Sequence, residues 1–223
     1  MRRKAIAGGL VVGLFLVCWM LLVWPREAIR KKSLAALDDV LARSRRTDLT
    51  VDQSEWQRAV SLAERALALD PDDTTRGKLR LCEGHVARIS GTTLNQLVDL
   101  NLAVVKFTEA QRLLPRSPDP QLGLAELYLR GLHDPDRARM ALTRAGALGY
   151  TTGDRETRLL ADGYRERADL RVGSARLAGT PAMARERLQQ AHNDYQKALE
   201  LYRALGSYGD AETVKSRLAE VGR

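Results

Sequence analysis

The chain of 223 residues has few cysteines and few aromatic residues, and both shortages narrow the possible folds. Cys18 lies in a long apolar segment and Cys82 is the only other cysteine, so no disulfide can form within the polar part of the chain. Aromatic residues make up 5% of the sequence, with only two phenylalanines, and Val and Ile are sparse beyond residue 25. Because β-branched and aromatic residues favour strands, this composition predicts helices rather than sheets.

The sequence also lacks any arrangement of residues typical of an active site. The three histidines, His85, His133 and His192, are far apart and have no partners at the spacing of a metal site or a catalytic triad. There is no glycine-rich phosphate loop, and residues 146–149 are better interpreted as a helix end. Paired carboxylates such as residues 72–73 are interpreted as partners of helix dipoles. We therefore predict that the chain is not an enzyme and holds no metal and no cofactor.

Charge of one sign is not concentrated anywhere, although the net charge is +8. Acidic residues alternate with arginine in runs such as residues 154–156 and 165–167. Such runs indicate solvated helix faces rather than a phosphate-binding stripe, so no specific nucleic acid is expected as a partner.

One long apolar run is present, at residues 6–24, directly after the basic residues 2–4. A helix of this length would measure about 28 Å, close to the hydrocarbon thickness of a bilayer. Residues 21–25 contain no small-x-small cleavage site, and Val17 disfavours lipoprotein processing at Cys18. A buried core helix would show a polar stripe, which this segment lacks. We therefore expect an uncleaved, single-pass membrane anchor.

Basic residues flank the anchor on both sides, so its orientation is nearly balanced. Counting them weakly favours a cytoplasmic domain, whereas the charged amino terminus favours a tail that stays inside. We expect a bacterial inner-membrane protein with its soluble domain outside the cytoplasm. The residues expected to contact lipid headgroups are Arg26, Arg30, Lys31 and Lys32. Within the anchor, small residues one turn apart predict pairing with another membrane helix through Ala5, Gly9 and Gly13.

Alanine and leucine recur at the same helical spacing in three segments, each followed by a proline or a glycine. The rows are Ala59, Ala63, Ala66 and Leu69 before Pro71; Ala103, Phe107, Ala110 and Leu113 before Pro115; and Ala138, Leu142, Ala145 and Leu148 before Gly149. A further helical segment precedes the second and third rows, at residues 78–89 and 121–130. A fourth such leading segment carries Leu160, Ala161 and Tyr164.

The stretch LAERALALDP and the segments LAELY and LADGY resemble tetratricopeptide repeats, which are antiparallel helix pairs of about 34 residues stacked in a superhelix. The resemblance covers residues 34–147, with a helical continuation to residue 223. Small residues at 84, 125 and 161 would let paired helices approach. In departures from the family pattern, no bulky residue stands at 80, 121 or 157, and about ten extra residues stand near 90–98.

Together, the apolar run and the resemblance predict an all-α fold, with an N-terminal transmembrane helix followed by a TPR-like α-solenoid of antiparallel helix pairs. The expected parts are the tail and anchor at residues 1–25, a juxtamembrane basic segment and first helix at 26–54, and the repeat domain with C-terminal capping helices at 55–223.

Repeats of this family form a concave surface from their leading helices, and this surface is the expected binding site. The residues expected to line it are Lys78, Leu81, His85, Arg88, Leu122, Glu126, Leu129, Arg155, Arg158 and Arg165. Such a groove suits an extended or helical peptide of mildly acidic character, although a merely solvated face fits the pattern equally well. Asp119 and Gly123 stand where chaperone-binding members carry basic clamp residues, which disfavours that ligand class.

Three functional classes remain open. The favoured one is a membrane-tethered adaptor or assembly scaffold that binds a protein partner in the groove. The alternatives are a structural accessory subunit of a larger membrane complex, held through the transmembrane helix, and a juxtamembrane binder of lipid or nucleic acid.

Overall fold

The computed structural model describes residues 24–46 and 51–221, and every regular element in these ranges is a helix. No strand occurs in them, so the prediction of an all-α chain is confirmed. The helices are α2 (Trp24–Ser44), α3 (Gln53–Leu69), α4 (Asp73–Leu94), α5 (Leu97–Leu113), α6 (Asp119–Arg130), α7 (Pro135–Ala147), α8 (Asp154–Arg176), α9 (Pro181–Ala204) and α10 (Tyr208–Val221).

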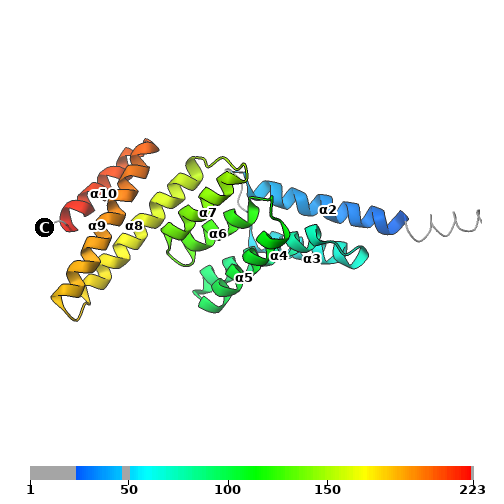
Figure 1. Ribbon diagram of the computed structural model, residues 1–223, viewed down its shortest axis with the longest axis horizontal. Helices are drawn as coiled ribbons and strands as arrows, with labels where there is room; N and C mark the ends of the chain where they lie inside the picture. The colour runs from blue at the N-terminus through cyan, green and yellow to red at the C-terminus, as the bar shows by residue number, and fades with distance from the viewer. Residues whose placement is uncertain (1–23, 47–50, 222–223) are drawn as a thin grey trace, which may run out of the picture.

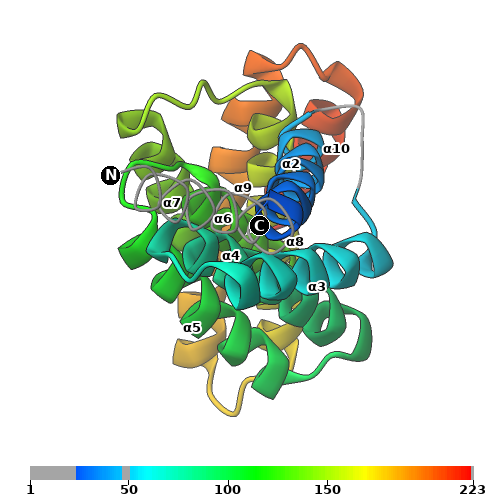
Figure 2. The same cartoon turned by 90° about the vertical axis from the view of Figure 1, so that its right-hand side faces the viewer.

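Helices that follow one another along the chain pack side by side. The pairs are α2 with α3, α4 with α5, α6 with α7 and α8 with α9, while α10 packs on α9. Figure 1 shows these pairs in sequence along the long axis of the molecule, from α2 and α3 at one end to α9 and α10 at the other. Figure 2 looks along that axis from the α2 end and shows α5 on the side of α4 that lies away from α2.

Side-chain caps fix where several helices begin. Asp52 accepts a hydrogen bond from the Glu55 backbone N–H at 2.8 Å, and Glu55 accepts one in return from the Asp52 N–H at 3.2 Å. Asp72 caps α4 by accepting from the Thr75 N–H at 2.8 Å, which confirms the predicted role of the carboxylates at residues 72–73 at a helix start.

The predicted alanine rows form the core. Every residue of the three rows that precedes the final leucine is buried, from Ala59 to Ala145. Two apolar clusters result, one built from α2 to α7 and the other from the end of α6 to α10. Small side chains at these positions let neighbouring helices approach closely, so that the many small contacts of a dense core are made.

Phe107 of α5 is a wedge between two leading helices. It is fully buried, and a Cβ atom added at Gly84 of α4 would lie 2.7 Å from its ring. A Cβ atom added at Gly123 of α6 would lie even closer to the same ring. Ordinary carbon contacts need about 3.5–4.0 Å, so only glycine fits at these two positions without displacement of the ring.

The extra residues near 90–98 lengthen helices rather than form a loop. Helix α4 continues to Leu94, and α5 begins at Leu97. The turn between them passes through Asn95, whose φ of 52° lies in the left-handed region that asparagine tolerates better than most residues.

The segment after the apolar run is a packed helix rather than a basic tether. Leu37, Val40 and Leu41 of α2 are buried in the first core cluster. On the same helix, Arg30 forms ion pairs with Asp72 at 2.9 Å and with Asp70 at 3.3 Å. Helix α2 therefore serves as the leading helix of the first pair.

The predicted anchor at residues 6–24, with Ala5, Gly9 and Gly13, lies outside the described residues apart from Trp24, where α2 begins. Within the described ranges, no helix is long and apolar enough to cross a membrane. The anchor and its helix pairing stay predictions.

Candidate functional site

A cavity of about 370 Å³ lies where α3, α4, α6 and α8 come together. Leucines from three leading helices form much of its wall, namely Leu81, Leu122, Leu129 and Leu159. The structure brings seven of the ten predicted groove residues to this cavity: Leu81, His85, Arg88, Leu122, Glu126, Leu129 and Arg155. The helical spacing that predicted one shared face for these residues also brings them to one cavity.

One side of the cavity is aromatic. The indole of Trp56 in α3 stacks on the imidazole of His85 in α4, with ring centroids 4.0 Å apart and planes 9° from parallel. The Phe107 ring meets His85 edge-on at 5.0 Å. His85 is 8% exposed, and its Nδ1 has no hydrogen-bond partner. This side therefore offers an apolar surface with one unused polar atom.

Beside it, one turn further along α4, lies an ionic cluster of two arginines and one glutamate. The Glu126 carboxylate accepts from Arg155 Nη2 at 2.9 Å, and it lies 3.2 Å from Arg88 Nη2. The Arg88 side chain is 12% exposed, and its Nε is buried without a partner. Arg130 adds a further positive charge to the lining. Glu126 and Glu156 oppose the three arginines here, the Glu156 carboxylate lying 4.0 Å from Arg155 Nη1, so this corner of the cavity keeps an excess of one positive charge.

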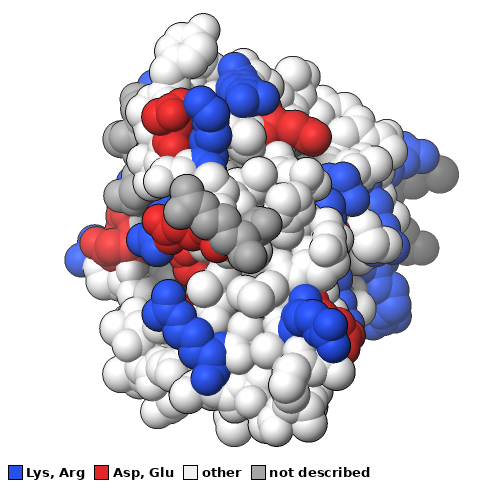
Figure 3. All heavy atoms as spheres, turned by 90° about the vertical axis from the view of Figure 1, so that its left-hand side faces the viewer, with Lys and Arg blue, Asp and Glu red and all other residues white. Residues whose placement is uncertain are grey.

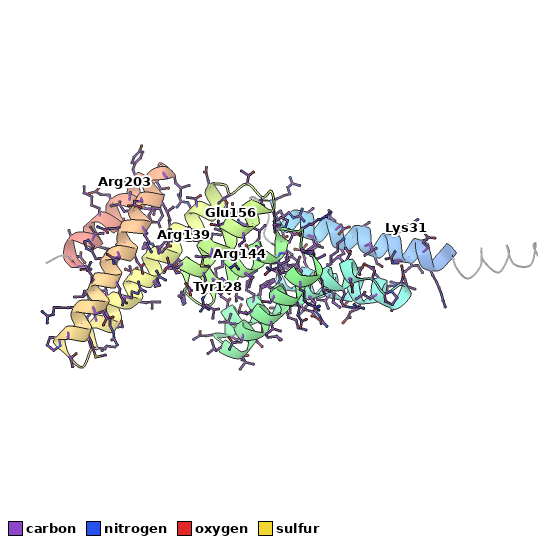
Figure 4. The ribbon with its side chains drawn as sticks, in the orientation of Figure 1. Lys31, Tyr128, Arg139, Arg144, Glu156 and Arg203 are labelled. Carbon is purple, nitrogen blue, oxygen red and sulfur yellow. The ribbon has the colours of Figure 1, made fainter. Side chains whose placement is uncertain are left out.

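The remaining charged groups of the lining have structural partners. Arg45 forms a bidentate ion pair with Asp119, which also accepts from Ser117 Oγ at 2.9 Å. Asp52 caps α3. Glu156, labelled in Figure 4 at the start of α8, accepts from the Gly153 N–H at 2.9 Å. These charged groups are therefore already paired within the fold.

Burial controls the titration of groups in and beside the cavity. Burial, with a smaller effect from the nearby Arg88 charge, holds the pKa of His85 well below its usual value, so the imidazole is neutral at pH 7. Burial raises the pKa of the Cys82 thiol to about 12, which makes it a poor nucleophile. Burial and the carboxylate of Glu156 raise the pKa of Tyr150 to about 12. The site therefore offers hydrogen bonds and fixed charge rather than a titrating group.

Three predicted groove residues lie elsewhere. Lys78 forms an ion pair with Asp38 of α2. Arg158 pairs with Asp210 of α10 at 3.0 Å, and Arg165 donates to the Tyr202 hydroxyl of α9 at 3.2 Å.

The cause of this difference is which face of α8 each residue occupies. Arg155 and Leu159, one turn apart, reach the cavity, whereas Arg158 and Arg165 contact α10 and α9. The aromatic side was missed because Trp56 belongs to a trailing helix, although it is the only tryptophan after residue 24.

The four residues predicted to meet lipid headgroups differ in their surroundings. Arg30 is engaged by Asp70 and Asp72, as described above. Lys31, labelled on α2 in Figure 4, pairs with Glu27 at 2.9 Å. Arg26 and Lys32 are exposed.

Charges of both signs mix on the surface at the α10 end of the molecule. Figure 3 shows Lys and Arg side chains among Asp and Glu side chains, with neutral atoms between them. In the described part of the chain, no group of three His, Cys, Asp or Glu residues is placed to hold a metal ion.

Scans of this chain against protein-family models, curated proteins and solved structures find no match. The resemblance to tetratricopeptide repeats therefore rests on the quoted motifs alone.

Proposed function

We propose that this chain is a membrane-tethered adaptor that binds a segment of a protein partner in the cavity between its helix pairs. In this proposal the pairs are repeats of the tetratricopeptide type, and residues 6–24 are the transmembrane anchor. The observation that carries it is the convergence of α3, α4, α6 and α8 on one cavity with an apolar wall and buried polar atoms that lack partners.

The unused polar atoms support binding because folded proteins rarely leave such groups unpaired. More than nine in ten buried polar groups have a hydrogen-bond partner in well-determined structures. Among the described residues, four buried side-chain atoms lack one, and two of these, His85 Nδ1 and Arg88 Nε, belong to residues that line the cavity. A bound segment would cover the leucines of the wall, and it would pair with the two covered atoms after a shift of the His85 or Arg88 side chain.

The test is crosslinking and affinity capture from intact membranes with the full chain and with a variant whose cavity is filled. Leu122 is partly buried and lines the cavity, so Leu122→Trp places an indole in the space that a partner would use. Leu170→Trp is the matched control, because Leu170 is 55% exposed on α8 outside the cavity. Circular dichroism of both variants verifies the fold.

We expect Leu122→Trp to lose the captured partner and Leu170→Trp to keep it. Equal recovery with both variants at unchanged helicity would refute the cavity as the binding site. If replacing the anchor by an unrelated span then abolished recovery, the structural-subunit alternative would stand in its place.

A further inference from the structure

We propose that the cavity recognises a short extended segment in which a bulky apolar side chain stands one or two positions from a carboxylate. This inference rests on the proposed function and adds to it the chemistry of the ligand. The apolar side chain would lie between the leucines and the Trp56–His85 stack, and the carboxylate would bind Arg88 and Arg155.

Charge complementarity supports the carboxylate. Arg88, Arg130 and Arg155 face the negative charges of Glu126 and Glu156, which leaves an excess of one positive charge at this corner. The Arg88 side chain is 12% exposed, so a hydrogen bond from its accessible part to a charged group is little weakened by water. A ligand carboxylate would reduce the excess charge.

The same lining argues against a polyanion. Asp52, Asp119, Glu126 and Glu156 all line the cavity, so a nucleic acid or a polyphosphate would meet four carboxylates. A ligand with a single carboxylate can place that group at the electropositive corner and keep it away from the other acidic side chains of the lining.

The spacing follows from helix geometry. His85 and Arg88 are three residues apart on α4, so the aromatic and ionic sides are about 4.5 Å apart along the helix axis. An extended chain advances about 3.3 Å per residue, which places the apolar and acidic residues one or two positions apart.

The test selects phage-displayed random 12-residue peptides on the full chain in detergent micelles. Peptides that also bind Leu122→Trp are removed by counter-selection. We expect the enriched peptides to carry Leu, Ile, Met or Phe one or two positions from Asp or Glu. Replacing that acid by its amide should weaken binding about tenfold or more, because a buried hydrogen bond to a charged group is worth about 1.5–3 kcal/mol.

Variants of the chain then locate the contact. In Arg88→Gln, the acidic peptide should keep only a small advantage over its amide, from Arg155, whereas Arg144→Gln, an exposed arginine of α7 outside the cavity, should keep the tenfold difference. Arg155→Gln is the second test variant if Arg88→Gln does not fold, because the Arg155 side chain is more exposed.

The outcomes separate this inference from the proposed function. Enriched peptides without an acidic residue, or an acid preference that survives both arginine variants, would overturn the carboxylate and leave the adaptor. No enrichment over Leu122→Trp would overturn both. Saturable binding of a fluorescent fatty acid to the full chain, absent in Leu122→Trp and unaffected by the peptides, would assign the cavity to a lipid and overturn both.

Discussion

The contact between Gly84 and Phe107 predicts a large energetic coupling between two substitutions. In the Gly84→Ala variant the new Cβ would lie 2.7 Å from two atoms of the Phe107 ring, about 1 Å inside ordinary contact. Overpacking of this kind costs about 1–3 kcal/mol, and the better helix propensity of alanine returns up to about 1 kcal/mol. We expect Gly84→Ala to lower the free energy of unfolding by about 1–2 kcal/mol.

The sign should reverse when the ring is absent. Phe107→Ala alone should cost about 3–5 kcal/mol, because it leaves a cavity in the first core cluster. In that background Gly84→Ala meets no ring, so it should stabilise by about 0.5–1 kcal/mol through helix propensity. The coupling energy between the two substitutions is then about 2 kcal/mol.

The assay is urea unfolding of residues 24–223, followed by circular dichroism, for both single variants and the double variant. Gly173→Ala on α8 is the control, because nothing lies within 4 Å of the added Cβ. This control should be neutral or slightly stabilising, alone and with Phe107→Ala. If Gly84→Ala changes the free energy of unfolding by the same amount, within about 0.5 kcal/mol, with Phe107 and with Phe107→Ala, the proposed contact between residue 84 and the ring is refuted.

Three further predictions concern the membrane anchor, the stability at low pH, and Arg158 and Arg165. The full chain should remain in the membrane fraction with an intact N-terminus by mass spectrometry; a mature chain that begins after residue 23 would contradict the anchor. Although burial raises the pKa of Asp136, hydrogen bonds from Arg167 and other donors hold it well below the usual value near 3.9, so its stabilising contribution is present above about pH 4 and lost on acidification through its folded pKa. The free energy of unfolding should therefore fall less between pH 6 and pH 2 in Asp136→Asn than in the unsubstituted chain. An equal fall in both chains would refute this prediction. Reversing Arg158 and Arg165 to Glu should leave partner capture intact, and its loss would show that the partner extends beyond the cavity.

Local periodicity was enough to predict the core of each helix pair. The rows of Ala59, Ala103 and Ala138 follow the 3.6-residue repeat, and the stop at Pro71 lies one residue before the cap of α4. These features depend on neighbours within one helix or one turn. They can be derived from the sequence because no distant contact is needed to define them.

The position of one helix along another could not be derived in this way. The motif aligned Ala161 of α8 with Gly84 of α4, but the close approach of α8 to the preceding pair occurs at Gly163, against Leu129. That choice depends on tertiary packing between side chains of different helices. It places Arg155 at Glu126, whereas Arg158 pairs with Asp210 of α10, so one of the three predicted arginines of α8 reaches the cavity.

The wedge and the cavity are parts of one packed unit, and this has a consequence for binding. Phe107 separates α4 from α6 and contacts His85, which in turn stacks on Trp56 in the cavity wall. A wall that is fixed by the core loses little conformational freedom when a ligand binds. Ordering the site therefore takes little from the binding free energy. Gly84→Ala should therefore weaken capture of the selected peptides although residue 84 does not line the cavity. Replacing Arg155, which is more exposed, should weaken peptide binding directly and change the free energy of unfolding little.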